Sequence, residues 1–173
     1  MGSYMEYQDT PVFWERFARL LGEAAAQTAS AVLPTLGPKG GRILSEEAAG
    51  GDLQTESDET AGTFLREFLS YSPVPLMLLD EKTGALLPLH DNPVVGVVAD
   101  ELDGTRPARM GMPTCCVSLA AFPLDGEHVL KNVRCGVIIR LDTEMDYTFV
   151  SGQGVWRMGK PLPVAPDNTP FHQ

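Results

Sequence analysis

The sequence predicts an α+β protein, with an N-terminal helical arm followed by a β-rich domain built as a sandwich or small barrel. Apolar residues recur at helical spacing early in the chain, and seven short strand-like runs separated by Gly, Pro, Asn and Asp follow residue 73. With 173 residues, 43% of them apolar, the chain can form one domain with a substantial core. We divide it into a helical arm with an acidic loop (1–72), a β-rich domain (73–160) and a proline-rich extended tail (161–173).

The first helix is expected to begin at Thr10, a good N-cap, with Pro11 at the first helical position. Pro34 ends it. Its apolar face consists of residues three and four apart: Phe13, Phe17, Leu20, Leu21, Ala24, Thr28 and Ala31. Such a face should dock against another surface, because burying each large side chain is worth roughly 1.5–3 kcal/mol.

The segment from Leu36 to Glu59 is predicted to be irregular, with a possible short strand at Ile43–Leu44. No Lys or Arg occurs between Ser45 and Leu65, which is typical of a solvated acidic loop. A second helix should start near Ser57 or Asp58 and end before Pro73.

The remaining chain carries β-branched and aromatic residues in short runs whose spacing suits a sandwich or barrel. The expected strands are Leu76–Leu79, Ala85–Pro88, Val94–Ala99, Cys115–Phe122, Val137–Leu141, Tyr147–Val150 and Val155–Met158. The prolines that follow keep the tail out of any central strand.

Charge and hydropathy limit the partners. The formal net charge of −10 opposes binding to nucleic acid and to anionic lipid, and no apolar run approaches the roughly 20 residues that span a bilayer. We therefore expect neither nucleic acid nor membrane as a partner.

Catalytic, metal and cofactor signatures are not recognised in the sequence. Cys115 and Cys116 are adjacent, and neighbouring strand residues point to opposite faces, so buried thiols are favoured over a zinc site with Cys135. The histidines, His90, His128 and His172, belong to no metalloprotease motif. The sequence predicts no catalytic, metal or cofactor residue.

Two further patterns resemble ligand-binding loops. The acidic run 52–59 lacks the alternating order of a calcium loop, and Gly152–Gly154 precedes a strand, so it is interpreted as a hairpin turn. The segment Thr35-Leu36-Gly37-Pro38-Lys39-Gly40 resembles the nucleotide-contacting loop of chaperonin equatorial domains, and Asp58 lies near the acidic residue of that family. This resemblance implies nucleotide binding, but the second glycine-rich chaperonin signature is missing.

A second resemblance lies between Val74 and Gly104. The residues Pro75-Leu76-Met77-Leu78, Thr83-Gly84, Leu86-Leu87-Pro88 and Val95-Gly96-Val97-Val98-Ala99-Asp100 resemble the head decoration proteins of lambda-type tailed bacteriophages. The resemblance implies a small β-rich fold that binds as trimers to the outside of a capsid.

From these patterns we expect a non-enzymatic structural protein, namely a capsid decoration (cement) protein that stabilises a phage head. It would be a homo-oligomer, a trimer if the resemblance holds, with a capsid protein or other protein as partner. Its location would be the virion if it is phage-encoded and cytoplasmic otherwise. The expected interface comprises Phe13, Phe17, Leu20, Leu21, Leu76, Leu78, Leu86, Val95 and Val97.

Two alternatives remain open. The first is a cytosolic nucleotide-binding or chaperonin-like protein that uses the Thr35–Gly41 loop. The second is a small-ligand-binding adaptor with a pocket lined by Met110, Met112 and Trp156.

Overall fold

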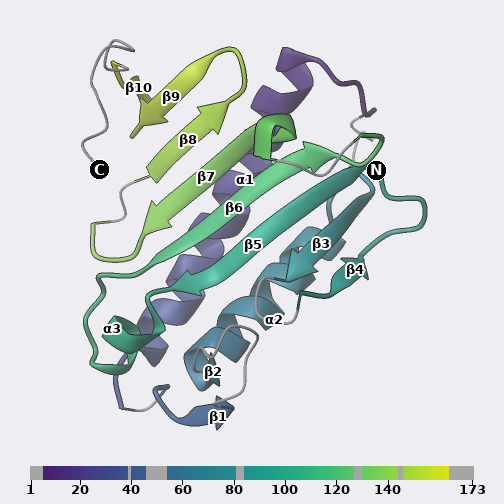
Figure 1. Ribbon diagram of the computed structural model, residues 1–173. Coiled ribbons are helices and arrows are strands. Elements are labelled where there is room, and N and C mark those ends of the chain that lie inside the picture. Colours follow the sequence, from purple (N-terminus) through teal and green to yellow (C-terminus); the bar gives the residue numbers. More distant parts are fainter. Residues whose placement is uncertain are drawn as a thin grey trace, which may run out of the picture.

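The computed structural model describes residues 6–38, 40–45, 54–80, 84–126, 130–143 and 146–163. It contains two long helices and one large sheet (Figure 1). The helices are α1 (Pro11–Val32), α2 (Glu56–Ser70), the short α3 (Thr105–Arg109) and the 3-10 turns η1 (Leu33–Thr35) and η2 (Leu130–Asn132). The strands are β1 (Ile43–Ser45), β2 (Gln54–Thr55), β3 (Leu76–Asp80), β4 (Leu86–Pro88), β5 (Val95–Asp103), β6 (Cys116–Pro123), β7 (Cys135–Arg140), β8 (Asp146–Val150), β9 (Gly154–Arg157) and β10 (Lys160–Pro161).

Eight of the strands form one sheet in the order β10-β9-β8-β7-β6-β5-β3-β4. All neighbours are antiparallel except β3 and β5, which run parallel. Strands β1 and β2 make a separate small antiparallel pair. Both outermost strands of the large sheet are short, and both contain a proline, Pro88 in β4 and Pro161 in β10.

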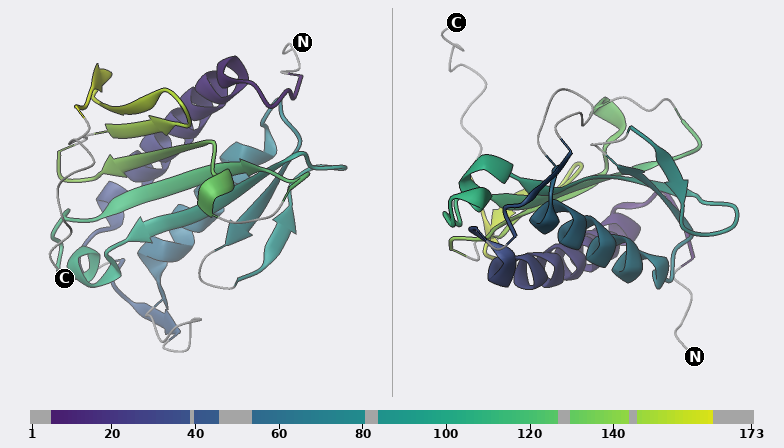
Figure 2. Two further views of the ribbon diagram at one scale, coloured as in Figure 1. Left: turned by 45° about the horizontal axis from the view of Figure 1, so that its top comes forward. Right: turned by 90° about the horizontal axis from the view of Figure 1, so that it is seen from below.

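Helices α1 and α2 lie side by side on one face of the sheet (Figure 2, right). Helix α1 contacts β6, β7 and β8, whereas α2 contacts β5. As expected, Thr10 caps α1 by accepting a hydrogen bond from the Phe13 amide at 3.3 Å, and Pro11 is its first residue. The helix is anchored by an aromatic cluster in which Phe13, Trp14 and Phe17 contact one another.

The core lies between the helices and the sheet. Alternate residues of adjacent strands, such as Leu78, Val97, Ala121 and Cys135, share this face in register and are buried. A single buried cluster joins these residues with those of both helices. The arm expected at 1–72 therefore packs onto the β-rich part; the boundaries at 72 and 160 stay predictions.

The α+β class is confirmed, and each of the seven expected strands lies in the sheet. The described strands form no sandwich or barrel, because helices rather than a second sheet cover the buried face. Among the described residues, no helix has the length and apolar character needed to cross a membrane.

Candidate functional site

Acidic residues gather where β5 ends. The strand continues past the expected Ala99 through Asp100, Glu101 and Leu102 to Asp103, with an irregular register against β6 after Asp100. Because β3 and β5 are parallel, their carboxyl ends meet at the same edge of the sheet. Asp80, the last residue of β3, pairs with Ala99 through the backbone. This edge is where ligands of open α/β sheets commonly bind.

The chain turns sharply after β5. Gly104 has φ +98°, a conformation that favours glycine, and a Cβ atom there would lie 3.0 Å from the Cβ of Cys115. The turn places Thr105 at the start of α3, two residues after the exposed Asp103. The sequence Asp100-Glu101-Leu102-Asp103-Gly104-Thr105 therefore brings carboxylates and a hydroxyl together in one turn.

Thr105 is held by a buried carboxylate from α2. Its hydroxyl Oγ1 donates to Oδ1 of Asp58 at 3.1 Å, across 47 residues of sequence. The other oxygen of Asp58 accepts from the amide of Thr55 at 2.7 Å and from its hydroxyl at 2.6 Å, completing a capping box at the start of α2. Asp58 is only 3% exposed, so these three donors replace the water that an ionised carboxylate would otherwise need.

The Thr35–Gly41 loop packs against this centre. Ser57 donates its hydroxyl to the carbonyls of Thr35 and Gly40, both at 3.1 Å, and the Gly37 amide donates to the Ala108 carbonyl of α3 at 2.8 Å. Gly40 is required by close approach, because a Cβ there would lie 2.1 Å from the Thr35 oxygen. The glycines of the chaperonin-like motif thus connect the first turns of α2 and α3; Lys39 lies outside the described residues.

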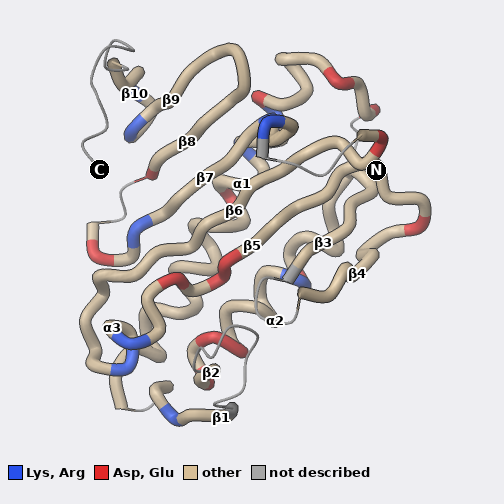
Figure 3. Tube along the Cα trace, viewed as in Figure 1, with Lys and Arg blue, Asp and Glu red and all other residues tan. Residues whose placement is uncertain are grey.

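A cavity of about 750 Å³ is lined by residues of α3, of the start of α2 and of the loop before β1. Three arginines line it, Arg42, Arg106 and Arg109, together with Glu56. In Figure 3 the blue segments at α3 and before β1 lie near the red segments at the end of β5 and the start of α2. Acidic and basic segments therefore both lie at this end of the sheet. We call this cavity the arginine cavity.

The three cysteine thiols have raised pKa values. Burial raises the pKa of Cys135 to about 12. Burial and the neighbouring Asp103 carboxylate raise the pKa of Cys116 to about 12, and its Sγ lies 3.6 Å from Oδ2 of Asp103. Thiols with such pKa values stay protonated near neutral pH. Among the described residues, no group of three or more His, Cys, Asp or Glu side chains could hold a metal ion.

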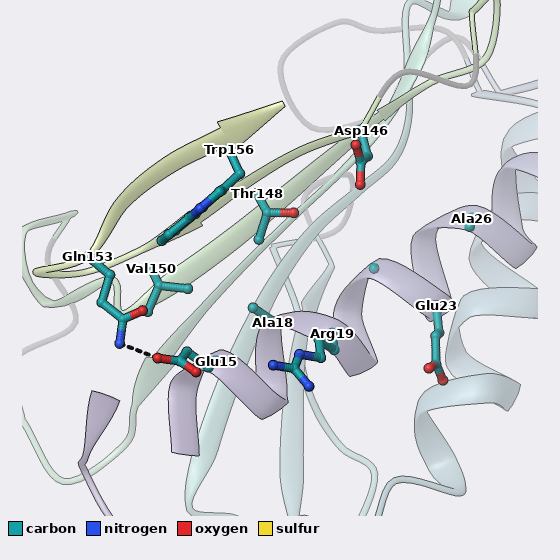
Figure 4. A pocket seen from close by; sticks show the side chains of 11 residues that line it. Glu15, Ala18, Arg19, Glu23, Ala26, Asp146, Thr148, Val150, Gln153 and Trp156 are labelled. Atoms are coloured by element: carbon teal, nitrogen blue, oxygen red, sulfur yellow. Dashed lines mark hydrogen bonds between the residues drawn. The ribbon is translucent and has the colours of Figure 1, made fainter. Parts of the chain in front are cut away.

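A second cavity, of about 710 Å³, lies between α1 and the β8–β9 hairpin (Figure 4). Trp156 lies over it, and Gln153 donates to Glu15 across its end. Met110 lines the arginine cavity instead, and Met112 lines neither of these two cavities. The structure therefore does not bring together the pocket of Met110, Met112 and Trp156 that the adaptor alternative required.

No protein-family model matches the sequence, and no curated protein matches it significantly. Solved structures do match. The chain has the inositol monophosphatase fold. The extragenic suppressor protein SuhB from Bartonella henselae superposes with a TM-score of 0.69 at 17% identity, over 87% of this chain and 55% of that one.

Two further structures agree. An inositol monophosphatase-fructose 1,6 bisphosphatase gives a TM-score of 0.68 at 17% identity, covering 84% of this chain and 54% of that chain. An inositol monophosphatase from Anabaena gives a TM-score of 0.63 at 19% identity, covering 88% of this chain and 50% of that chain. The chain spans about half the length of the solved structures it matches.

These matches overturn several expectations. The neighbours are inositol monophosphatase and extragenic suppressor proteins, so the identification as a phage decoration protein is wrong, and so is the virion location. The prediction of a non-enzymatic structural protein is overturned too, because the neighbours carry the names of enzymes. The chaperonin-like and adaptor alternatives receive no support from them.

The residues expected at an interface lie mostly inside the chain. Six of them, Phe17, Leu21, Leu76, Leu78, Val95 and Val97, are fully buried, and Phe13 is nearly so. Leu20 is partly buried, whereas Leu86 is 55% exposed. Their burial explains their apolar pattern, and a role in oligomer or partner contacts stays a prediction.

Sequence reasoning did not predict this site: Asp58 was noted only within the chaperonin-like resemblance, and Asp100, Asp103 and Thr105 received no catalytic or binding role. The available signal was a cluster of acidic residues closing an apolar strand and followed directly by Gly-Thr. Of the histidines, His90 accepts a hydrogen bond from the Leu76 amide at 3.3 Å, while His128 and His172 lie outside the described residues. Gly152–Gly154 forms the β8–β9 turn, as expected.

Proposed function

We propose that this chain binds phosphate monoesters of small polyols or sugars and hydrolyses them at the Asp103–Thr105 turn. The fold supports this proposal, since its structural neighbours are named as inositol monophosphatases and as a fructose 1,6 bisphosphatase. The observation that carries it is the hydrogen bond from the Thr105 hydroxyl to the buried Asp58 carboxylate, beside the carboxylates that end β5.

This pair is suited to accept a proton from water. A water molecule that hydrogen-bonds to Oγ1 of Thr105 could pass its proton to that oxygen as Thr105 passes its own proton to Asp58. The water oxygen then forms a bond to phosphorus while the bond to the ester oxygen breaks, and the leaving alcohol takes a proton from solvent. Burial of Asp58 keeps its carboxylate aimed at Thr105, so the proton acceptor is already in position.

Cations commonly neutralise the charge of a transferring phosphoryl group. Asp100 and Asp103 offer hard oxygen ligands of the kind that Mg²⁺ accepts. The described residues contain no group of three acidic, His or Cys side chains at one point, so these two carboxylates are only part of a ligand set for such an ion.

The test is phosphate release from inositol 1-phosphate and fructose 1,6-bisphosphate, each measured with Mg²⁺ and with chelator. Thr105→Val should lower kcat by about 10²-fold or more, whereas Thr105→Ser, which keeps the hydroxyl, should retain most of it. Thr143→Val is the matched control, because that exposed hydroxyl donates to Asp142 in the turn after β7 and to neither Thr105 nor Asp58. Absence of phosphate release from both substrates in all conditions, or equal rates for Thr105→Val and the parent, would refute the proposal.

A further inference from the structure

We infer that the cavity between α1 and the β8–β9 hairpin binds a small organic amine, with the ammonium group at Asp146 and the apolar body between Trp156 and α1. We call this cavity the Trp156 cavity; its lining comes from α1, β8, β9 and the turn between these two strands. The described residues that line it include none from the Asp103–Thr105 turn, so the inference does not depend on the proposed phosphatase activity.

Small residues of α1 leave the space for this cavity. Ala18, Gly22 and Ala26 recur at every fourth position, so they form one row on the face of α1 toward the hairpin. A Cβ atom added to Gly22 would meet no other part of the chain within 4 Å. The row spans eight residues at about 1.5 Å each, or about 12 Å. With a volume of about 710 Å³, this slot is within the size range of small-molecule sites.

The opposite wall is apolar and aromatic. Trp156 pairs with Thr148 in the β8–β9 ladder, and in Figure 4 its ring lies over the cavity, across from Ala18. Val150, the next residue on the same face of β8, is 3% exposed. Trp156 is half-buried, packing against the core on one side and lining the cavity with the rest of its surface. Such a wall favours a slim apolar body or a ring that stacks on the indole.

Asp146 supplies a carboxylate at one end of the cavity. It pairs with Ile139, which is 7% exposed on the covered face of β7, so the Asp146 side chain projects toward α1. Its Oδ1 atom is buried and accepts no hydrogen bond from the described residues. A smaller cavity of about 360 Å³ shares Asp146, Gly22 and Ala26 with the Trp156 cavity. The carboxylate therefore lies between two hollows, where a ligand can reach it.

The charge of the lining favours a cation at Asp146. A buried carboxylate oxygen without a donor is unfavourable, and an ammonium group would give it a charge-assisted hydrogen bond. The charged side chains of the lining are three carboxylates and one guanidinium, namely Glu15, Glu23, Asp146 and Arg19. In Figure 4 the Arg19 guanidinium extends toward Glu15, which accepts from Gln153, rather than toward Asp146. The field at the Asp146 end is therefore negative.

The distance between the two features limits the ligand. Asp146 and Thr148 lie two residues apart on one strand, about 7 Å, and Trp156 is opposite Thr148. A molecule that donates to Asp146 and stacks on Trp156 therefore has its ammonium group joined to a ring by a short linker. Arylethylamines have this form.

The experiment titrates the parent chain with 2-phenylethylamine and follows the indole N–H signals by NMR. The chain contains two tryptophans, so two signals report two places. The Trp156 signal should shift with a Kd below about 1 mM. The signal of Trp14, whose Nε1 donates to Asp9, should not shift. Two matched ligands, 3-phenylpropionate with a carboxylate in place of the ammonium and butylamine without the ring, should each bind about tenfold more weakly or worse.

Variants assign the contacts. Asp146→Asn should weaken binding of 2-phenylethylamine about tenfold, and Gly22→Leu, whose side chain would fill the slot, should abolish it. Trp156→Leu removes one indole signal, which assigns that signal, and should weaken binding about fivefold in calorimetry. Asp91→Asn makes the same substitution at an exposed position between β4 and β5, and it should leave the Kd unchanged.

The inference is overturned if the Trp156 signal stays in place up to about 10 mM amine, if 3-phenylpropionate binds as tightly as the amine, or if Gly22→Leu binds like the parent. Gly22→Leu decides the matter if Asp146→Asn does not fold, because leucine is a better helix former than glycine and the space at this position is open. Phosphate release has no part in these measurements, so a failure of the proposed function would leave their outcome unchanged.

Discussion

The network of Thr55, Asp58 and Thr105 leads to a prediction that can be measured without any substrate. Asp58→Ala removes the acceptor of the buried Thr55 amide and hydroxyl and of the Thr105 hydroxyl. Loss of the capping box costs about 1 kcal/mol. Leaving a buried amide without its partner adds about 1–2 kcal/mol, so we expect Asp58→Ala to lower the free energy of unfolding by about 2–3 kcal/mol.

Thr105→Val isolates one contact of this network. It replaces the hydroxyl by a methyl group of similar size and leaves the cap of α2 intact, so we expect a loss of about 1 kcal/mol. If the hydrogen bond from Thr105 to Asp58 contributes to stability, the double variant should lose less than the two single variants together, by about 1 kcal/mol.

The assay is urea unfolding followed by circular dichroism for the parent, the two single variants and the double variant. Thr143→Val is again the control and should change stability by less than about 0.5 kcal/mol, because its hydroxyl is exposed. If the two losses add to within about 0.3 kcal/mol, Thr105 and Asp58 are not coupled, and the reasoning behind the proposed proton acceptor is refuted.

Three further predictions concern two glycines, the three cysteine thiols, and the ion pair between Asp9 and Arg134. Gly40→Ala should destabilise the chain by more than about 2 kcal/mol, because the new Cβ would meet the Thr35 oxygen. Gly22→Ala, where the new Cβ would lie in open space on α1, should instead stabilise the chain by up to about 1 kcal/mol. Melting temperatures that shift in the same direction for both variants would contradict this prediction. The pKa values of Cys115, Cys116 and Cys135 are raised to about 11, 12 and 12. Alkylation at pH 8 should therefore leave the three thiols of the folded chain largely unmodified, whereas all three should be labelled in urea. Fast labelling of the folded chain would disprove this prediction. The bidentate hydrogen bonds from Arg134 lower the pKa of Asp9 below 3.8, so this pair stabilises the fold above that pH and its contribution is lost as the pH falls through the lowered value. Arg134→Gln should therefore cost up to about 1 kcal/mol at pH 7 and much less near pH 2, and a cost independent of pH in urea titrations would show that the pair is not formed.

Local signals in the sequence predicted the elements well. Thr10 and Pro11 begin α1 because capping and the missing proline amide act over a few residues, whatever the rest of the chain does. Helix α2 begins at Glu56, one residue before the earliest predicted start, because Thr55 rather than a later residue caps it. The alternation of apolar residues likewise located the strands but carried no information about what would cover them.

The arrangement of the elements and the site depended on contacts between distant residues. A β-rich pattern is compatible with a sandwich, a barrel or an open sheet covered by helices. The sheet is open and covered by helices because α1 and α2 pack on one of its faces. The site was missed because Asp58 and Thr105 lie 47 residues apart, and nothing local marks them as partners. The expected strand ended at Ala99 and the residues after it received no role, although the parallel pairing of β3 and β5 places the following turn at the edge of the sheet.

The two ends of the large sheet have a consequence for how this chain associates. Exposed strand edges offer unpaired amides and carbonyls on which further chains can stack, and this is the route to fibril growth. Here β4 and β10 are only 3 and 2 residues long, and Pro88 and Pro161 each remove an amide donor from the edge. Elongation of the sheet from chain to chain is therefore blocked at both ends, which protects a protein with a long, strongly paired sheet from polymerising through its own backbone.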